Sequence, residues 1–367
     1  MEGKNIFVNL VLLVALIVFV FIGFALIHAI DTLRFRAEKV IEELAKLDAK
    51  ISGIERMLVG GMPVKNLSDR AKRSFGENAE IANKDYYDPE AEPGGRLIFA
   101  TSADTKNMNA IINNEAFVSA IWGYAYDSLC ERNFEHPEIF EPKLAESWSL
   151  SEDKMTYTIK LRKGILWHDF TDPVNGKKWE NIEVVADDFK FYVDVIKNED
   201  VDCAPMRSYL MDIDRIEVVS DYEFKVIWKK PYFLSESITL GLSPLPRHLY
   251  HSYEGTFDGK KFNDDHERNR MLVGCGPYRF LKWEKDQRII LKRWDKYYGA
   301  KYGIMPAIET LAFEIIKDSN TRLQSLIAGK IDRMDLTPEQ WVKRTSSKEF
   351  DEETGIIKKF KYPGRSY

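Results

Sequence analysis

The sequence predicts an α/β domain with mixed sheets, preceded by one transmembrane helix. From residue 96 onward, alternating apolar patterns typical of strands are interspersed with patterns of helical spacing, as expected of an α/β or α+β domain. The chain has 367 residues, 44% of them hydrophobic, which is enough for two domains and a sizeable core. Residues 6–30 form an almost unbroken apolar run without a charge.

This N-terminal run is expected to anchor the protein in a membrane. Its length of about 25 residues, at about 1.5 Å per residue, spans a ~30 Å bilayer core with some tilt. The run is longer than the apolar part of a typical signal peptide and no small-x-small cleavage site follows it, so we expect an uncleaved anchor. Lys4 precedes the run, whereas Arg34, Arg36 and Lys39 follow it. The positive-inside rule alone would therefore leave the following domain in the cytoplasm.

Residues 31–60 are expected to form an amphipathic helix next to the anchor. Apolar residues there recur at alternating spacings of four and three, namely at Val40, Leu44, Leu47, Ile51, Ile54 and Leu58. The pattern covers fewer than three heptads, which leaves two interpretations open: a juxtamembrane helix, or a short coiled coil that pairs two copies through residues 33–58. Gly60-Gly61-Met62-Pro63 ends the pattern, and the polar residues 61–92 are expected to be a linker.

The globular part is expected to begin with a buried strand at residues 96–101 and a helix over 117–129. The helix is indicated by the spacing of Val118, Ile121, Trp122, Ala125 and Leu129. The later elements are a strand at 155–162, a helix that opens at Val185, strands at 213–219 and 223–228, a short helix around His248, and a hairpin of 278–283 with 288–294.

Composition and motifs argue against several functional classes. The net charge of −5 gives no reason to expect a nucleic-acid partner. Cys130, Cys203 and Cys275 make no C-x-x-C pair, so neither a zinc site nor another cofactor is expected. We expect them to be three small buried residues, with one disulfide and a spare thiol as the alternative. Adjacent carboxylate pairs such as Asp187-Asp188 do not converge on one substrate, and no catalytic motif occurs, so we expect no enzyme.

The turn Gly274-Cys275-Gly276-Pro277 is the most informative local motif. We expect a positive φ at the glycines and a fixed φ at the proline, so the chain should reverse its direction sharply before the hairpin. A lone Gly-x-Gly is weak evidence for phosphate binding, since no second glycine motif or helix start follows it.

Several ordered blocks resemble those of the family 5 extracellular solute-binding proteins, the peptide- and nickel-binding receptors of ABC importers. The strongest lies in residues 142–189, where Pro-x-Leu-Ala-Glu-Ser-Trp is followed by the strand at 155–162, a Trp-His-Asp segment and Ala-Asp-Asp-Phe. Further blocks follow in the family's order at 243–246, 274–278 and 327–332. The likeness covers residue 96 to the end, with one departure, an insertion around 173–182.

The resemblance implies a periplasmic-binding-protein-like fold of the class II, or cluster C, type. Residues 93–126 and 247–367 would form the core of the first lobe, and residues 127–246 the extra subdomain of the family. The second lobe would be absent from this chain, which is then a fragment or one half of a split protein. The implied location is the inner membrane, with the domain in the periplasm or outside the cell, opposite to the orientation that charge alone predicts.

The resemblance also implies the position of the ligand. It places Asn114, Glu115 and Ala116 beside the ligand, because they follow the family's Leu-Asn/Asp-Pro-like motif, here Met108-Asn109-Ala110 without the proline. The same reasoning points to Met206 with Arg207, and to Leu336 with Thr337. An exposed loop is the alternative for the first set, and core packing for Met206. The motif tryptophans are expected in the core, namely Trp148, Trp167, Trp283 and Trp294.

The implied function is the substrate-binding component of an ABC importer, which presents oligopeptides or similar small solutes to permease subunits. Nickel complexes, haem and oligosaccharides stay open as ligands. The competing hypothesis is a membrane-tethered sensory or interaction protein that keeps the fold without transport.

Overall fold

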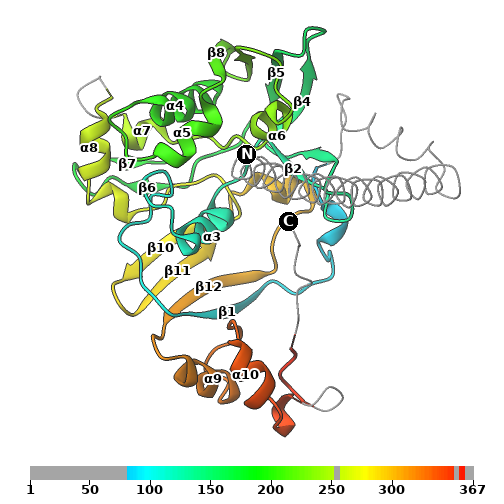
Figure 1. Ribbon diagram of the computed structural model, residues 1–367, viewed down its shortest axis with the longest axis vertical. Coiled ribbons are helices and arrows are strands. Elements are labelled where there is room, and N and C mark those ends of the chain that lie inside the picture. The colour runs from blue at the N-terminus through cyan, green and yellow to red at the C-terminus, as the bar shows by residue number, and fades with distance from the viewer. Residues whose placement is uncertain (1–80, 252–256, 351–354, 360–367) are drawn as a thin grey trace, which may run out of the picture. The chain divides into compact units, whose positions relative to one another are not determined.

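The computed structural model describes residues 81–251, 257–350 and 355–359 (Figure 1). The chain divides into two units, Met1–Arg70 and Ala71–Tyr367, and every element below belongs to the second. The predicted anchor, the heptad helix and most of the linker lie outside the described residues. Within the described ranges, no helix is both long and apolar enough to cross a membrane.

The first sheet is mixed and has four strands in the order β1-β12-β11-β10. Its strands are β1 (Gly94–Thr101), β12 (Ile308–Ile315), β11 (Arg288–Arg293) and β10 (Tyr278–Glu284). β1 pairs with β12 in parallel, with Phe99 opposite Phe313, whereas β10, β11 and β12 pair antiparallel. The predicted mixed sheet and the predicted hairpin are confirmed. β1 is half-buried along most of its length, not buried as expected.

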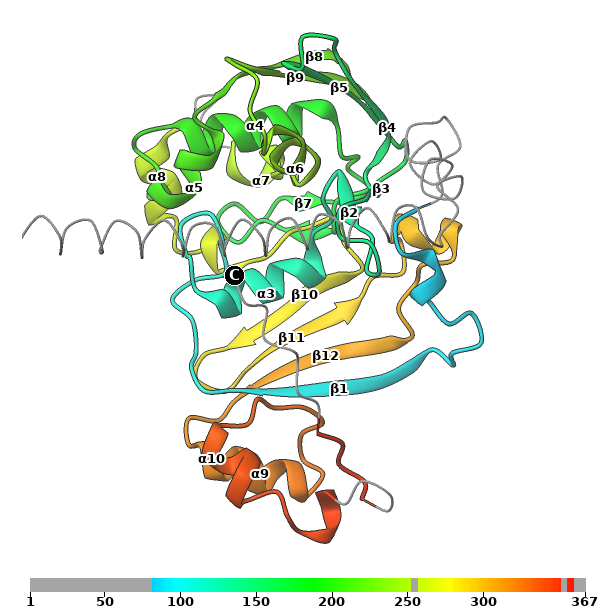
Figure 2. The same cartoon turned by 45° about the vertical axis from the view of Figure 1, so that its right-hand side comes forward.

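Helices pack around this sheet (Figure 2). α3 (Ala116–Ala125) packs on β10, and α9 (Ser319–Ile327) and α10 (Pro338–Lys343) follow β12 in the chain. The short 3-10 helices are η1 (Lys84–Tyr86), η2 (Arg268–Arg270), η3 (Tyr298–Tyr302) and η4 (Lys348–Phe350). The predicted helix at 117–129 is four residues too long, since α3 ends at Ala125 and the backbone turns extended at Tyr126.

The second sheet is antiparallel, with its strands in the order β4-β5-β9-β8. The strands are β4 (Ala145–Leu150), β5 (Thr156–Leu161), β9 (Glu223–Trp228) and β8 (Ile213–Ser220). Burial alternates along β9, as expected of a sheet with one face against a core. The helices of this region are α4 (Ala186–Lys197), α5 (Ala204–Leu210), α6 (Ser235–Leu240), α7 (Arg247–Tyr250) and α8 (Gly259–Asp264).

Two small hairpins complete the fold. One consists of β2 (Cys130–Arg132) and β3 (Phe140–Pro142), and the other of β6 (Phe170–Thr171) and β7 (Lys178–Trp179). The second carries the insertion noted in the sequence. A buried ion-pair cluster fixes it, because Arg268 contacts Asp172 and Asp265 at 2.9 Å each.

The Gly-x-Gly-Pro turn packs tightly against the end of α3. Neither Gly274 nor Gly276 has a positive φ, so that part of the prediction was wrong. Glycine is needed for a different reason: a Cβ on Gly274 would lie 1.9 Å from the Ala125 carbonyl oxygen, and one on Gly276 would lie 2.7 Å from the Ala125 carbonyl carbon. His168 holds the other side of the turn, where its Nδ1 accepts from the Gly274 nitrogen at 3.2 Å and its Nε2 donates to the Gly276 oxygen at 2.9 Å.

The core contains the residues that the motifs placed there. All four motif tryptophans are buried, namely Trp148, Trp167, Trp283 and Trp294. The three cysteines are free and buried, which confirms the interpretation as small core residues.

Candidate ligand-binding site

One face of α3 carries only small side chains at its exposed positions. Val118, Ile121 and Ala125 are buried against the fold, whereas Ala116, Ser119, Ala120 and Gly123 are exposed. Their spacing of three and four places them in one stripe along the helix. A ligand can therefore approach the backbone of α3 closely along this stripe.

The residues that the resemblance placed beside the ligand lie at the start of this stripe. Asn114 and Ala116 are exposed, and Glu115 is the N-cap residue of α3. The loop before them is held by buried amides: Asn109 Nδ2 donates to Asn269 Oδ1 at 2.9 Å, and Asn113 Nδ2 donates to the Thr105 hydroxyl at 2.8 Å. The Met108-Asn109-Ala110 motif thus has a structural role.

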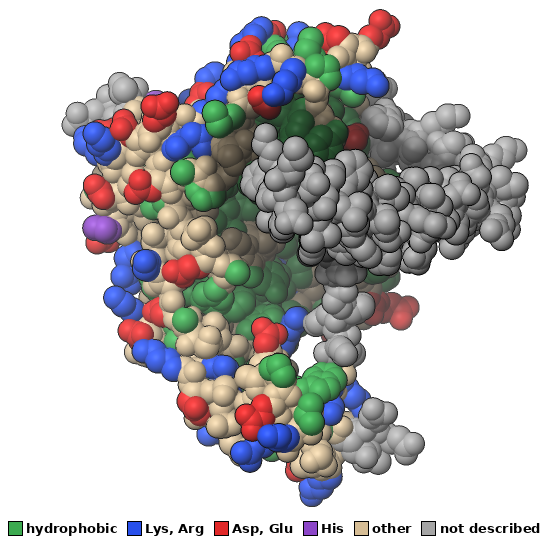
Figure 3. Space-filling view, in the orientation of Figure 1, with side chains coloured by type: hydrophobic (Ala, Val, Ile, Leu, Met, Phe, Trp, Pro, Cys, Tyr) green, Lys and Arg blue, Asp and Glu red, His purple; other side chains and the backbone are tan. Residues whose placement is uncertain are grey.

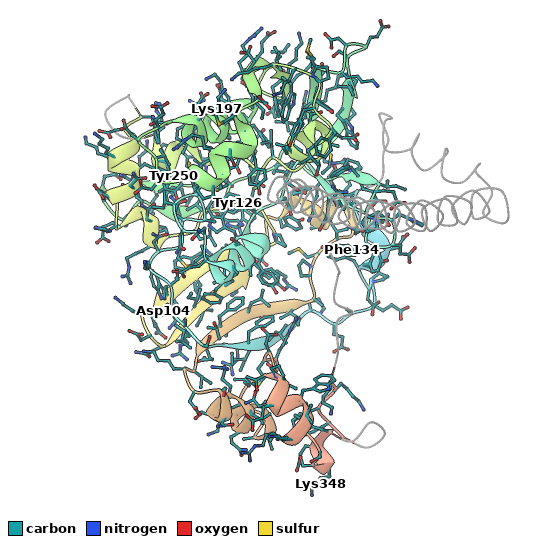
Figure 4. All side chains as sticks on the ribbon, viewed as in Figure 1. Asp104, Tyr126, Phe134, Lys197, Tyr250 and Lys348 are labelled. Carbon is teal, nitrogen blue, oxygen red and sulfur yellow. The ribbon has the colours of Figure 1, made fainter. Side chains whose placement is uncertain are left out.

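A polar pocket of about 290 Å³ lies at the other end of α3. It is lined by Trp122, Gly123, Tyr126, Asp127, Ser128, Glu131, Lys143 and Ser243. Figure 4 labels Tyr126 just beyond α3, toward the region of the second sheet.

In Figure 3, apolar side chains gather at the centre of the displayed face, over α3 and the neighbouring strands, and charged ones lie mostly toward its margins.

Asp127 is the centre of the charge network at this pocket. Its carboxylate is buried, contacts the Lys143 ammonium at 2.9 Å, and accepts from the hydroxyls of Tyr297 and Tyr298 at 2.8 and 2.9 Å. Lys143 also contacts Glu131 at 3.0 Å. Burial alone would lower the pKa of Lys143, but Asp127 and Glu131 outweigh it and raise that pKa. Burial, followed by Asp127, raises the pKa of both phenols well above its ordinary value.

The other predicted site residues lie on separate elements. Met206 on α5 lines an apolar pocket of about 200 Å³ between α4, α5 and α6. Arg207 donates to the main-chain oxygens of Ile196, Asn198 and Val201, so it clamps the end of α4.

Leu336 is half-buried, and Thr337 is the N-cap of α10, where its hydroxyl accepts from the Gln340 nitrogen at 3.2 Å. The three sets therefore lie at the start of α3, on α5 and just before α10, and a ligand contact for each of them remains a prediction.

Sequence reasoning missed the polar pocket because it extended α3 through Asp127. A signal was present: Asp127 is one charge within the apolar stretch Ala125-Tyr126-Asp127-Ser128-Leu129-Cys130. A carboxylate in such a stretch is buried only with partners. Those partners, Lys143 and the Tyr297-Tyr298 pair, are too distant in sequence to be identified from a single chain.

The sequence is similar to curated peptide-binding proteins. It is 25% identical over 243 residues to the oligopeptide-binding protein AppA of Bacillus subtilis (strain 168), covering 66% of this chain and 40% of that protein. It is 29% identical over 213 residues to the dipeptide-binding protein of Escherichia coli (strain K12), covering 55% of this chain and 37% of that protein. The chain thus spans about two fifths of the length of these relatives.

The fold is similar to solved structures of binding proteins of ABC transporters. The ABC transporter substrate-binding protein CtaP of Listeria monocytogenes matches with a TM-score of 0.56 and 25% identity, covering 69% of this chain and 46% of that one. DppA of Helicobacter pylori, solved with the peptide STSA, matches with a TM-score of 0.57 and 24% identity, covering 70% of this chain and 49% of that one. Residues 140–365 match the family described as "Bacterial extracellular solute-binding proteins, family 5 Middle". The chain belongs to the family 5 bacterial extracellular solute-binding proteins.

Proposed function

We propose that this chain is the ligand-binding part of an ABC-importer receptor for oligopeptides. The observation that carries the proposal is the exposed stripe of small residues on α3, which leads to the polar pocket in a member of this family. An extended peptide can lie along a helix whose side chains stop at Cβ or Oγ, because its backbone then reaches the protein surface. The relatives named for oligopeptides and dipeptides support this ligand class.

The organisation proposed for the chain follows its two sheets. Residues 93–126 with 247–367 are proposed as the first-lobe core, and the membership of β1, β10, β11 and β12 in one sheet supports the parts of these ranges that carry the strands. At the start of the second range, α7 and α8 lie beside α4 and α5 instead (Figure 2). Residues 127–246 form the extra subdomain, supported by the second sheet, all of whose strands fall within this range. The α3 stripe is open to solvent, and we infer that a second lobe covers the ligand during transport.

The N-terminal part is proposed to tether the domain on the outer side of the membrane. The apolar run at 6–30 and the absence of a cleavage site support an uncleaved anchor, and membership in an extracellular family supports the outward orientation. Residues 33–58 are proposed as an amphipathic or pairing helix. The partners would be permease subunits, and the receptor would bind its ligand without chemical change.

Calorimetry tests the binding function. The complete protein is titrated with a mixed pool of tri- to pentapeptides, and then with the tightest defined peptide. We expect saturable binding, and we expect Ser119→Trp on the α3 stripe to weaken it at least about tenfold, because an indole would occupy the peptide path. Lys190→Trp on α4, a half-exposed helix position in the extra subdomain, is the matched control and should leave binding unchanged. Absence of saturable peptide binding by the folded wild type would refute the proposal.

A further inference from the structure

Gly123 has no packing reason to be glycine. It lies within α3, where glycine costs up to about 1 kcal/mol of stability relative to alanine. A Cβ at Gly123 would meet no heavy atom within 4 Å, in contrast to Gly274 and Gly276, which are pressed against Ala125. Its φ is not positive either. What distinguishes Gly123 is that it lines the polar pocket, so its missing side chain keeps the pocket open.

The walls of this pocket are rigid and aromatic. The rings of Trp122 and Tyr126 stack with their centroids 4.2 Å apart and their planes 8° apart. The Trp122 indole nitrogen donates to the Met108 oxygen at 2.6 Å, and the Tyr126 hydroxyl donates to the Val273 oxygen. These bonds hold both side chains in place. Stacking covers one face of each ring, so the outer face of the pair is the one that can attract a cation.

The charges that line the pocket are unbalanced. Asp127 and Glu131 contribute two negative charges and Lys143 one positive charge, which leaves one negative charge. The Lys143 ammonium lies between the two carboxylates, 2.9 Å from Asp127 and 3.0 Å from Glu131. Asp127 also accepts hydrogen bonds from the hydroxyls of Tyr297 and Tyr298. Glu131 is the accessible carboxylate, with 34% of its side chain exposed. Arg162 donates to the Lys143 carbonyl and is not among the lining residues.

We propose that this pocket binds the positively charged group of a ligand, a primary ammonium or a guanidinium, between Glu131 and the Trp122-Tyr126 rings. The identification of that ligand as a peptide with a basic side chain rests on the function proposed above. The volume of about 290 Å³ equals roughly ten water molecules, enough for one lysine or arginine side chain. Gly123 keeps the way into the pocket open from the α3 stripe.

A small-molecule titration tests the pocket without peptides. Arginine and its neutral isostere citrulline are titrated into the full chain while the Trp122 indole signal is followed by NMR. Assignment of that signal uses the Trp122→Phe variant. We expect arginine to shift the signal and to bind about tenfold tighter than citrulline, the effect of one partly desolvated charge contact together with a cation–π contact.

Four variants identify the groups responsible. Glu131→Gln should reduce the preference for arginine to about twofold or less, whereas the exposed Glu152→Gln should preserve it. Gly123→Leu should abolish arginine binding by filling the pocket. Gly123→Ala, which adds only a Cβ in open space, should bind within about threefold of the wild type. Equal binding of arginine and citrulline, or a preference that survives Glu131→Gln, would overturn the inference.

A pair of peptides then connects the pocket to transport. Ala-Arg-Ala should bind about tenfold tighter than Ala-citrulline-Ala, and Glu131→Gln should remove the difference. If both peptides bind equally and arginine shifts nothing, the pocket inference fails while the receptor function stands. If arginine binds as expected but no peptide binds, the receptor function fails and the cation pocket stands.

Discussion

The main-chain nitrogen of Gly276 donates a hydrogen bond of 2.7 Å to the carbonyl oxygen of Ala125, the last residue of α3. This contact joins the turn before β10 to the helix that carries the proposed ligand stripe. It places two backbones so close together that no side chain fits between them. The position of α3, and with it the direction of the stripe and the pocket, therefore depends on this backbone contact.

Substitution at the turn should destabilise the protein strongly. In Gly274→Ala the new Cβ would lie 1.9 Å from the Ala125 oxygen, so α3 or the turn must move. We expect a loss of about 3 kcal/mol or more in the free energy of unfolding, as for severe overpacking. Urea unfolding followed by circular dichroism measures it. Gly123→Ala is the matched control and should be neutral or stabilising by up to about 1 kcal/mol; equal stability of the two variants would contradict the close contact.

His168 should make stability depend on pH between about 6.5 and 4. Burial lowers the pKa of His168 from 6.5 to about 4, so in this range the unfolded chain binds a proton that the folded chain excludes. The free energy of unfolding should therefore fall as the pH falls from about 6.5 toward 4, by up to about 3 kcal/mol from this residue. His248, whose pKa burial also lowers to about 4, acts in the same direction.

The measurement is urea unfolding at a series of pH values from 7.5 to 4.5. His168→Gln should lower the stability at pH 7.5, because it disturbs the bonds to Gly274 and Gly276, and should show a shallower decrease toward acid. A parallel decrease in wild type and variant would show that His168 is not the group responsible.

The ion-pair cluster at Arg268 should be costly to break. The Arg268 side chain is 6% exposed, and its partners Asp172 and Asp265 are 0% and 9% exposed. Arg268→Met would leave two buried carboxylates without their cation, and we expect a loss of about 3–5 kcal/mol in the free energy of unfolding. Lys343→Met, which removes an exposed pair with Glu339, should cost at most about 0.5 kcal/mol. Comparable losses in the two variants would contradict the burial of the cluster.

The three cysteines should be unreactive in the folded protein. Cys130, Cys203 and Cys275 are buried, and burial raises the pKa of each thiol. Because the thiolate is the reacting species, DTNB at pH 8 should release little thionitrobenzoate over an hour, and close to three equivalents after denaturation in guanidinium. Rapid reaction of a thiol before unfolding would show that this part of the core opens.

The sequence predicted the local elements well where the periodicity was strong. The hairpin of β10 and β11 and the alternating β5 and β9 followed from residue patterns alone, whereas the burial of the four motif tryptophans was expected from their place in the blocks that resemble the family. The end of α3 was placed four residues late because Leu129 continues the apolar spacing, although the chain has already turned at Tyr126. The role of the paired glycines was misassigned, since close approach to Ala125 is a tertiary fact that no local pattern contains.

The candidate site was less accessible to prediction than the fold. The exposed stripe on α3 can be read from the sequence, because Ala116, Ser119, Ala120 and Gly123 fall between the apolar positions of one helix. The polar pocket cannot, because Lys143 and Tyr297 approach Asp127 only in the folded chain.

The parallel pairing of β1 with β12 has a consequence for synthesis on the ribosome. Leu97 pairs with Leu311. β1 therefore leaves the ribosome early and stays without its partner strand β12 while more than 200 further residues are added. The second sheet is complete once Trp228 has been made, and it can therefore form first, as a local unit. Until β12 arrives, β1 is an unpaired edge of half-apolar character, the kind of segment that nascent chains must shield from premature association.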